Sequence, residues 1–264
     1  MPTTFRPYLA RTPIALAHRG GALYGPNVWL ENTLTAFRNA VALGYTHVET
    51  DVHLTRDGRL VAFHDSRLDR VTDRRGRIRD LTWEEVRDAS LGGSERIPLL
   101  TDVLDALPGV NLNIDLKAPG TARPLWDLIE SRGLHEMTCV GSFSQRAITE
   151  FRRLARGRVA TAAARIGTAL MVLGPRPLSR VLRSPADVFQ VPTTAVVVGR
   201  EIALATRRLV EMAHRHGKQV HVWTIDDAAE MHRLLDLGVD GLVSDRIDVL
   251  KAVLVERGTW TGTG

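Results

Sequence analysis

The segment HVETDVHLTRDGRLVAFHD, residues 47–65, determines how the rest of the sequence is interpreted. Side chains alternate between the two faces of a β-strand, so Glu49, Asp51 and His53 share one face while apolar side chains occupy the other. An Asp-Gly turn then brings the chain back to His64. Two carboxylates this close repel each other unless a cation or a proton lies between them. The segment therefore predicts a strand that carries acidic groups into a functional site.

Further strands are expected along the rest of the chain, where short β-branched runs alternate with amphipathic helical patterns almost from end to end. The expected strands are Ile14–His18, Val48–Thr55, Asn111–Lys117, Thr138–Ser142, Val159–Ala163, Val188–Pro192, Gln219–Ile225 and Gly241–Ser244. The expected helices are Leu34–Leu43, Thr101–Ala106, Ala122–Ser131, Gln145–Ala155, Arg165–Leu173, Glu201–His216, Asp227–Leu237 and Ile247–Glu256. Eight strands that are each followed by a helix predict an α/β fold, a TIM-type (β/α)8 barrel.

One stretch is too long for a simple connection between a strand and its helix. It runs from Arg59 to about Leu100 and contains a second short strand, an arginine-rich turn region and a small helix. We expect a small insertion at residues 66–100, after the second strand and at one mouth of the barrel. No linker-like composition marks a separate domain, so a single barrel domain is expected over residues 1–264.

Composition excludes several classes of protein. The 44% hydrophobic and 25% charged content is that of an ordinary globular chain and excludes disorder. The one cysteine, Cys139, cannot form an intrachain disulfide, which fits a reducing compartment. The apolar run near the N-terminus is interrupted by Pro13 and is too short for a signal peptide. Because no stretch approaches the ~18 apolar residues of a membrane span, we expect a soluble, cytoplasmic protein.

The positive charge of the chain is spread out rather than clustered. The formal net charge is +5, and three lysines accompany 32 arginines that are distributed over the whole sequence. Binding to nucleic acid normally requires a basic patch or stripe. We therefore interpret the arginines as a solvated surface and predict no nucleic-acid partner.

Polar residues gather where the expected strands end. His18 and Arg19 follow the first strand, and Asp115 and Lys117 lie two apart on the third. Carboxylates without a cysteine or histidine cluster favour a hard cation, Mg²⁺ or Ca²⁺. Arginine and lysine side chains suit a phosphate, and His18 and His64 can transfer protons near neutral pH. Active sites of such barrels lie at the carboxyl ends of the strands, so these residues indicate one reaction site.

Seven motifs in register resemble those of the glycerophosphodiester phosphodiesterases. They are H-R-G (18–20), E-N-T-x-x-A-F (31–37), E-T-D-V-H-x-T-x-D-G-x-L-V-x-F-H-D (49–65), I-P-L-L (97–100), N-I-D-L-K (113–117), V-W-T-I-D (222–226) and G-V-D-G-L-V-S-D (238–245). The resemblance extends over about residues 14–250. It implies a TIM-type barrel, one divalent cation, and hydrolysis of glycerophosphodiesters to glycerol 3-phosphate and an alcohol.

The resemblance also implies a role for each matching position. Of the residues concerned, the acid–base pair is His18 and His64, the metal ligands are Glu49, Asp51 and Asp115, the phosphate is held by Arg19 and Lys117, and the glycerol or head-group pocket is lined by Trp223. His53 shares the acidic face of its strand without being a ligand in the family pattern. We expect it to support a neighbouring group.

Two departures from the family pattern concern the ligand set and the first loop. Asp115 stands where the family usually has a glutamate, which bears on the coordination distance and the preferred ion. Residues 20–30 form a longer and more apolar loop than usual, in which Leu30 replaces a proline. Tyr24 and Trp29 of this loop are expected to shape access for the leaving group, which favours a lipid-like substrate.

Simpler explanations remain open for several of these residues. Trp223 could be barrel packing. Glu31 and Asn32 could cap the first helix. Asp65 is expected to orient a neighbour or to start a turn. The remaining histidines without acidic partners at metal-like spacing are assigned to the surface or to supporting positions: His214, His216, His221 and His232.

Two other functions remain open alongside glycerophosphodiester hydrolysis. The same site could act on lysophospholipids, as a lysophospholipase D-like hydrolase or a cyclising lyase, and would then need an apolar groove near Tyr24, Trp29 and residues 66–96. A non-catalytic anion-binding barrel is the alternative from another class. A small-molecule phosphodiester, including a lysolipid, is the expected partner, with no nucleic acid and no transmembrane segment, and the sequence does not indicate an oligomeric state.

Overall fold

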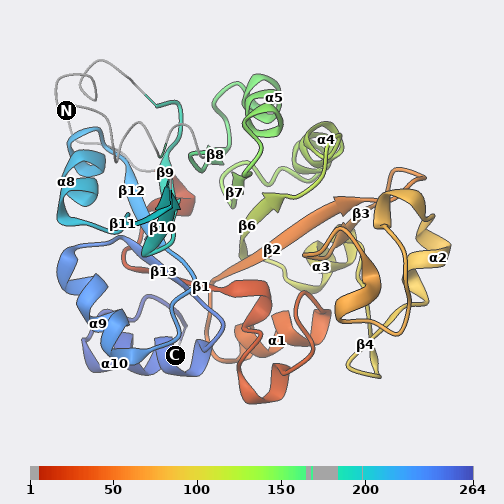
Figure 1. Cartoon of the computed structure of the whole chain (residues 1–264), viewed down its shortest axis with the longest axis horizontal. Helices are drawn as coiled ribbons and strands as arrows, with labels where there is room; N and C mark the ends of the chain where they lie inside the picture. The colour runs from red at the N-terminus through yellow and green to blue at the C-terminus, as the bar shows by residue number, and fades with distance from the viewer. Residues whose placement is uncertain (1–5, 165–167, 169–183, 198, 264) are drawn as a thin grey trace.

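Eight parallel strands form the barrel that the sequence predicts (Figure 1). The computed structural model describes residues 6–164, 168, 184–197 and 199–263. The barrel strands are β1 (Ile14–Ala17), β2 (His47–Leu54), β6 (Asn111–Leu116), β7 (Thr138–Gly141), β8 (Ala160–Thr161), β9 (Val188–Val191), β12 (Gln219–Val222) and β13 (Gly241–Ser244). They pair in the order β8-β7-β6-β2-β1-β13-β12-β9. A parallel bridge between Ala162 and Val188 brings the two ends of this sheet together. All eight strands were expected, and the TIM-type fold is confirmed.

Helices pack around the strands and bury one face each. Their bounds are α1 (Leu34–Ala42), α3 (Leu100–Ala106), α4 (Ala122–Arg132), α5 (Gln145–Ala155), α8 (Arg207–Arg215), α9 (Ala228–Leu237) and α10 (Ile247–Glu256). In α5 the buried face includes Ile148 and Phe151, and the Ser144 side chain accepts a hydrogen bond from the backbone N–H of Ala147 at the start of the helix. The expected helix Arg165–Leu173 lies outside the described residues apart from Thr168. None of the helices in the described ranges has the length and apolar character to cross a membrane.

The expected helix Glu201–His216 is wrong in its first part. Residues Thr194–Val197 (β10) and Arg200–Ala203 (β11) form an antiparallel hairpin instead. β-Branched residues favour the extended backbone of β10, and Ile202 pairs with Ala195 across the hairpin. The helix begins only where the Thr206 side chain accepts a hydrogen bond from the backbone N–H of Leu209.

The segment after β2 has a small hydrophobic core of its own. Strand β3 (Leu60–Ala62) pairs antiparallel with β2, and the chain then forms η4 (Leu68–Arg70), η5 (Ile78–Asp80), α2 (Trp83–Arg87), β4 (Ser90–Leu91) and β5 (Glu95–Arg96). Its buried side chains are Val61, Phe63, Leu68, Ile78, Val86, Ala89, Leu91 and Ile97. Residues 66–97 of this segment, which correspond to the expected insertion, lie at one side of the barrel in Figure 1, around α2 and β4. The insertion therefore packs around its own hydrophobic core beside the barrel.

The amino ends of the strands are filled by buried polar groups. The short helix η1 (Pro7–Leu9) buries Tyr8, whose carbonyl oxygen lies 3.1 Å from Nε2 of His47. His221 is fully buried and hydrogen-bonds the Gln219 side chain at 3.0 Å, so of the surface or supporting position expected for it, the surface position is wrong. Burial lowers the pKa of His47 to about 4 and that of His221 to about 3. Both rings are neutral in the folded protein near neutral pH.

These two histidines should make the protein less stable in mild acid. Below the usual histidine pKa of ~6.5 the unfolded chain binds protons that the folded chain refuses, so the free energy of unfolding should fall as pH drops from about 6.5 to about 4. Each histidine contributes about 1.4 kcal/mol per pH unit within that window. Chemical denaturation at a series of pH values gives the free energy of unfolding at each pH. Between about pH 6.5 and 4, this free energy should fall less steeply with decreasing pH in His47→Gln than in the native chain. Equal slopes would contradict this account.

Candidate active site

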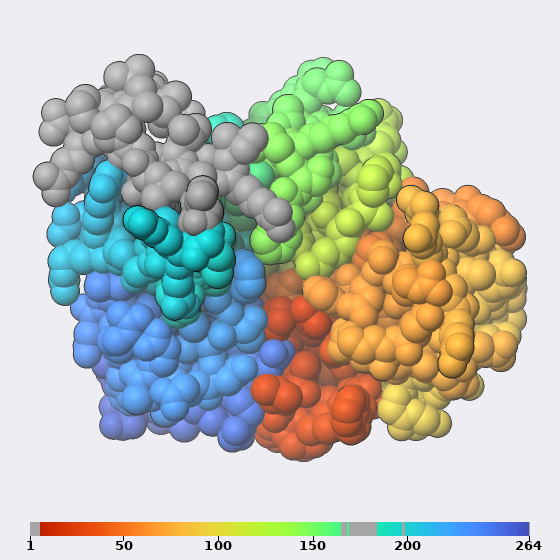
Figure 2. All heavy atoms as spheres, in the orientation of Figure 1, coloured from red at the N-terminus to blue at the C-terminus, as the bar shows by residue number. Residues whose placement is uncertain are grey.

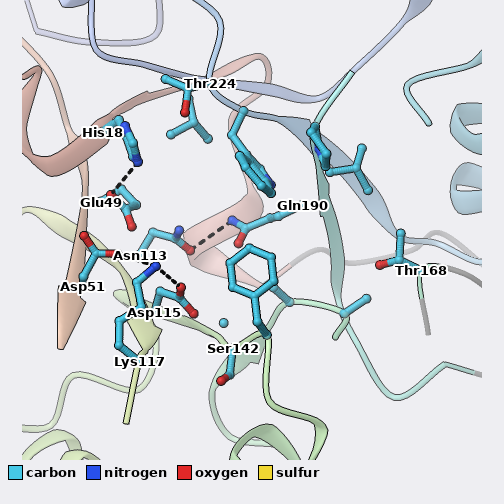
Figure 3. A pocket seen from close by; sticks show the side chains of 18 of the residues that line it. His18, Glu49, Asp51, Asn113, Asp115, Lys117, Ser142, Thr168, Gln190 and Thr224 are labelled. Atoms are coloured by element: carbon cyan, nitrogen blue, oxygen red, sulfur yellow. Dashed lines mark hydrogen bonds and ion pairs between the residues drawn. The ribbon is translucent and has the colours of Figure 1, made fainter. Parts of the chain in front are cut away.

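A single cavity opens at the carboxyl ends of the barrel strands. Its volume is about 670 Å³, and its lining includes all eight residues that were expected to form the site: His18, Arg19, Glu49, Asp51, His64, Asp115, Lys117 and Trp223. Figure 2 shows the molecule hollowed where the red N-terminal segment meets the green and teal segments. In Figure 3, charged side chains gather on one side of the pocket, while Gln190 and Thr168 lie on the other. The fold thus brings together residues from five separate strand ends.

The register of two strands places the three carboxylates. Asp51 on β2 lies directly beside Asp115 on β6 in the parallel pair, and Glu49 lies beside Asn113. Asp51 and Glu49 are almost fully buried, with 1% and 6% of their surface exposed. Neighbouring residues of a parallel pair point to the same face of the sheet, so the acidic pattern of β2 continues onto β6.

Lys117 neutralises part of this buried negative charge. Its Nζ lies 2.9 Å from Oδ1 of Asp51 and 2.7 Å from Oδ2 of Asp115. Burial opposes the charge on Lys117, but these two carboxylates outweigh it and raise the lysine pKa. Burial likewise opposes the charge on Asp51, while Lys117 and Arg19 attract it and lower the Asp51 pKa. Asp51 and Lys117 are therefore an ionised pair.

Glu49 has less compensation than Asp51. Burial, followed by repulsion from Asp51, raises the pKa of Glu49 to about 7. Burial also raises the pKa of Asp115, although Lys117 opposes that shift. The site thus holds more buried carboxylate than its own cations neutralise, which is an arrangement that attracts further positive charge.

Arg19 is held in place by three acidic side chains. Its backbone is left-handed, with φ 50°, and its N–H donates a hydrogen bond to Oε2 of Glu49 at 3.1 Å. Its guanidinium donates to Oε1 of Glu31 at 3.2 Å. Its Nε lies 3.2 Å from Oδ2 of Asp51, yet this buried atom makes no hydrogen bond because the direction of approach is unsuitable. Arg19 is thus a guanidinium held at the cavity by Glu31 and Asp51.

Each of the two candidate histidines has its Nδ1 held by a carboxylate. Nδ1 of His18 lies 2.8 Å from Oδ1 of Asp245, and Nδ1 of His64 lies 2.6 Å from Oδ1 of Asp65. A carboxylate only accepts, so Nδ1 carries the proton in both rings and Nε2 is left for other work. Nε2 of His18 lies 3.8 Å from Oε2 of Glu49. Burial lowers the pKa of His18, but Glu49 and the bond to Asp245 outweigh burial and raise it overall.

Asp65 and His53 behave as supports. Asp65 orients its neighbour His64, as the sequence predicted. The Nε2 of His53 donates a hydrogen bond to the backbone carbonyl of His64 at 3.0 Å. Burial lowers the pKa of His53, which keeps this ring neutral and its bond to the chain unchanged near neutral pH. Both contacts position the segment that carries His64.

The simpler explanation left open for Glu31 and Asn32, capping of the first helix, is not what the structure shows, and sequence reasoning gave no role to Asp245. The cap of α1 is Thr33, whose side chain accepts from the N–H of Ala36. Asn32 instead donates to Oδ2 of Asp51 at 3.0 Å, and Glu31 binds Arg19. Asp245 follows β13 directly, in the same position relative to its strand as the polar residues that were selected. That position is the signal that could have identified it.

Trp223 both packs and faces the cavity. It is partly buried against the barrel core, and its ring meets the Phe143 ring edge to face, with 5.8 Å between centroids. Phe143 was not identified from the sequence. Nζ of Lys117 lies 5.6 Å from the centre of the Phe143 ring. This aromatic pair therefore lines the cavity next to the charged groups.

The apolar side of the cavity is not where the sequence placed it. Tyr24 packs against the barrel core and Trp29 is 71% exposed, and neither lines the cavity. The apolar lining comes instead from β7, β9 and the β10–β11 hairpin, through residues Phe143, Ala163, Val191, Pro192, Ala195, Val196 and Leu204. The hairpin that replaced part of the expected helix supplies much of this wall.

The chemistry of the acidic residues fits a hard divalent cation. Three carboxylates that supply only oxygen donors line one cavity, and the positive charges near Glu49 do not offset its burial and its repulsion from Asp51. In the part of the chain that the structure describes, however, no three His, Cys, Asp or Glu side chains are already grouped as a metal site. Lys117 takes the position between Asp51 and Asp115. The donor set therefore suits a cation, while its present arrangement is an ion-paired one.

Comparisons with known proteins identify the family. Residues 18–249 match the glycerophosphoryl diester phosphodiesterase family. The chain is 39% identical over 255 residues to a probable glycerophosphodiester phosphodiesterase of Mycobacterium tuberculosis, covering 94% of this chain and 93% of that protein. It is 26% identical over 265 residues to a lysophospholipase D of Homo sapiens, covering 87% and 82%.

A solved structure shows the same fold. It is a phosphodiesterase from Oleispira antarctica in complex with the product sn-glycerol-3-phosphate, with a TM-score of 0.73, 23% identity, and coverage of 92% of this chain and 97% of that one. This likeness supports the barrel architecture. The family match spans most of the chain, and the chain therefore belongs to the glycerophosphoryl diester phosphodiesterase family and is a phosphodiesterase.

Proposed function

We propose that this phosphodiesterase hydrolyses glycerophosphodiesters to glycerol 3-phosphate and an alcohol, with a divalent cation and with His18 and His64 as the proton-transfer pair. One observation carries the proposal. Two imidazoles, each with its Nδ1 fixed on a carboxylate, line the same cavity as two cations and three carboxylates. Fixed Nδ1–H tautomers leave Nε2 of both rings for the substrate.

Phosphate binding is assigned to Arg19 and Lys117. The buried Nε of Arg19 has no hydrogen-bond partner, and Lys117 is a positively charged ammonium at the centre of the site. General acid–base groups supply about 10²- to 10⁴-fold each, whereas phosphate-ester hydrolysis can need acceleration approaching ~10²¹-fold. Charge neutralisation and positioning must therefore provide most of the rest, which explains the number of cationic groups.

Proton transfer is assigned to the two imidazoles. Nε2 of one histidine takes the proton of the attacking hydroxyl while the oxygen of that hydroxyl forms its bond to phosphorus. The other histidine, protonated, gives a proton to the leaving alkoxide oxygen as its bond to phosphorus breaks. The attacking group is water, or the glycerol hydroxyl of the substrate by way of a cyclic phosphate. A quenched time course that traps cyclic glycerophosphate identifies the second route, and its absence identifies the first.

Glu49, Asp51 and Asp115 would hold the divalent cation, Mg²⁺ or Ca²⁺. When bound, it would neutralise charge on the phosphate and polarise the phosphorus centre. Glu49, whose raised pKa reflects uncompensated burial, has the most to gain from such a charge. Trp223 would line the pocket for the glycerol or head group.

The two histidines should be separable by leaving group. His18→Ala and His64→Ala should each lower kcat for glycerophosphocholine by about 10²- to 10⁴-fold. A diester with a p-nitrophenolate leaving group needs no proton from the enzyme, so the variant lacking the general acid should recover on it and the other should not. Steady-state kinetics on both substrates checks this. Wild-type activity in both variants would refute the acid–base roles.

Removing divalent ions should abolish activity reversibly. A chelator should stop hydrolysis of glycerophosphocholine, and added Mg²⁺ or Ca²⁺ should restore it. A cation that binds only the folded chain also stabilises it, so the melting temperature should rise with the ion in the native protein and not in Asp115→Asn. Full activity in chelator would exclude the cation. Ser142→Ala, at the same cavity but without a carboxylate, is the control.

A second substrate class is favoured by the apolar side of the cavity. Beyond Trp223, the wall from β9 and the hairpin offers aliphatic side chains where the acyl chain on the glycerol of a lysophospholipid would lie. A relative at 26% identity is named as a lysophospholipase D. We therefore propose lysophospholipids as additional substrates of the same site.

The hairpin should affect only the acylated substrate. Val196 is 74% exposed and lines the cavity, so Val196→Asp should fold normally. It should lower kcat/KM for lysophosphatidylcholine by about 10-fold, because the acyl chain loses apolar contact, and leave glycerophosphocholine almost unchanged. Val255→Asp, at an exposed apolar position on α10, is the matched control. Equal effects on both substrates would refute the assignment.

A further inference from the structure

We propose that Arg70, which belongs to the insertion and not to the barrel, is a positioning residue for both His64 and Arg19. This inference rests on the proposed function of those two residues. Arg70 is the last residue of η4, a short helix whose Leu68 is fully buried in the core of the insertion. That core anchors the backbone from which the Arg70 side chain extends.

The guanidinium of Arg70 grips two carboxylates at once. Its Nε donates to Oδ2 of Asp65 at 2.6 Å, and its Nη2 lies 3.2 Å from Oδ1 of the same residue. Its Nη1 and Nη2 donate to the two carboxylate oxygens of Glu31, at 3.1 and 2.6 Å. Both pairs are bidentate, which fixes the direction of each carboxylate as well as its distance. Arg70 thereby ties Asp65 to Glu31.

The same two carboxylates hold the groups that would act on the substrate. Oδ1 of Asp65 accepts from Nδ1 of His64 at 2.6 Å. Oε1 of Glu31 accepts from the guanidinium of Arg19 at 3.2 Å. The contacts form one unbroken series in the order Arg19, Glu31, Arg70, Asp65, His64. The insertion is thus connected to a phosphate-binding residue at one end and to a proton-transfer residue at the other.

Positioning explains this series better than stability does. The side chain of Arg70 is 48% exposed, while those of Glu31 and Asp65 are 13% and 24% exposed, so solvent screens these ion pairs in part and each contributes about 1 kcal/mol to folding. Asp65 and Glu31 lie outside strands and α-helices, so no regular backbone fixes their side chains. Without Arg70, Asp65 could turn away from His64, and the ring would lose its fixed Nδ1–H tautomer. A loss of order at this contact affects the reaction more than the fold.

A lysine should not replace Arg70. An ammonium is a point charge without the planar fork that binds a carboxylate through two parallel hydrogen bonds. Arg70→Lys keeps the charge and loses the geometry. The comparison of Arg70→Lys with Arg70→Ala therefore separates an electrostatic effect from a positioning effect.

The test compares these variants with Arg67→Ala as the matched control. Arg67 lies in the same segment and pairs with the exposed Asp69 at 3.1 Å, away from the catalytic groups. With glycerophosphocholine and the divalent ion restored, Arg70→Ala should lower kcat by about 10- to 100-fold, and Arg70→Lys should recover less than half of that loss on a logarithmic scale. Arg67→Ala should remain within about twofold of the native enzyme, and the melting temperatures should stay close.

An NMR measurement makes the outcome independent of turnover. Long-range ¹H–¹⁵N spectra of the imidazoles should show His64 as a single Nδ1–H tautomer in the native chain and as a tautomer mixture in Arg70→Ala, with His18 unchanged. A native kcat in Arg70→Ala, or an unchanged His64 tautomer, overturns the proposal. If Arg70→Ala does not fold, Arg70→Lys decides by the same two readouts. An inactive native enzyme with the expected tautomer change would refute the proposed function alone.

Discussion

The rest of the site depends on two buried carboxylates on one strand, because their negative charge must be compensated. Glu49 and Asp51 lie two residues apart on β2, almost without exposed surface, and each needs a positive partner or a hydrogen-bond donor. Lys117 and Asn32 supply these to Asp51, and the backbone of Arg19 supplies one to Glu49. The negative charge that remains on these carboxylates could attract a divalent cation, and that cation could in turn neutralise the phosphate of a substrate. The same two buried carboxylates therefore determine which partners the fold must supply and which ligand the site could bind.

The parallel barrel is what allows these partners to come from distant parts of the sequence. In a parallel sheet the carboxyl ends of all strands lie on one side, so residues that follow β1, β2, β6, β12 and β13 reach one cavity. The register between β2 and β6 sets Asp51 beside Asp115. A shift by a single residue would turn one of these side chains to the opposite face, which ties the site to the hydrophobic pattern of its strands.

The barrel and most of the site could be predicted because both depend on local patterns. Alternation marked β2, and polar residues at strand ends marked His18, Asp115 and Lys117. What escaped prediction depends on tertiary contact. Residues 201–203 of β11 directly precede a helix and were expected to begin it, and pairing across the hairpin, such as Ile202 with Ala195, makes them a strand instead. Arg70 looks like any surface arginine until Glu31 and Asp65 are seen on either side of it.

The insertion and the β10–β11 hairpin each add contacts to the site that the barrel strands do not provide. The barrel strands fix the charged residues at their ends, and Arg70 joins the loops after β1 and β3 from outside the barrel. On the opposite side the hairpin adds apolar surface beside Trp223 and Phe143. In the proposed function, the insertion positions His64 and Arg19 through Arg70, and the hairpin provides the apolar surface against which the acyl chain of a lysophospholipid would lie. Because the two have no strand in common, substrate preference can change through the hairpin while the proton-transfer geometry is preserved through Arg70.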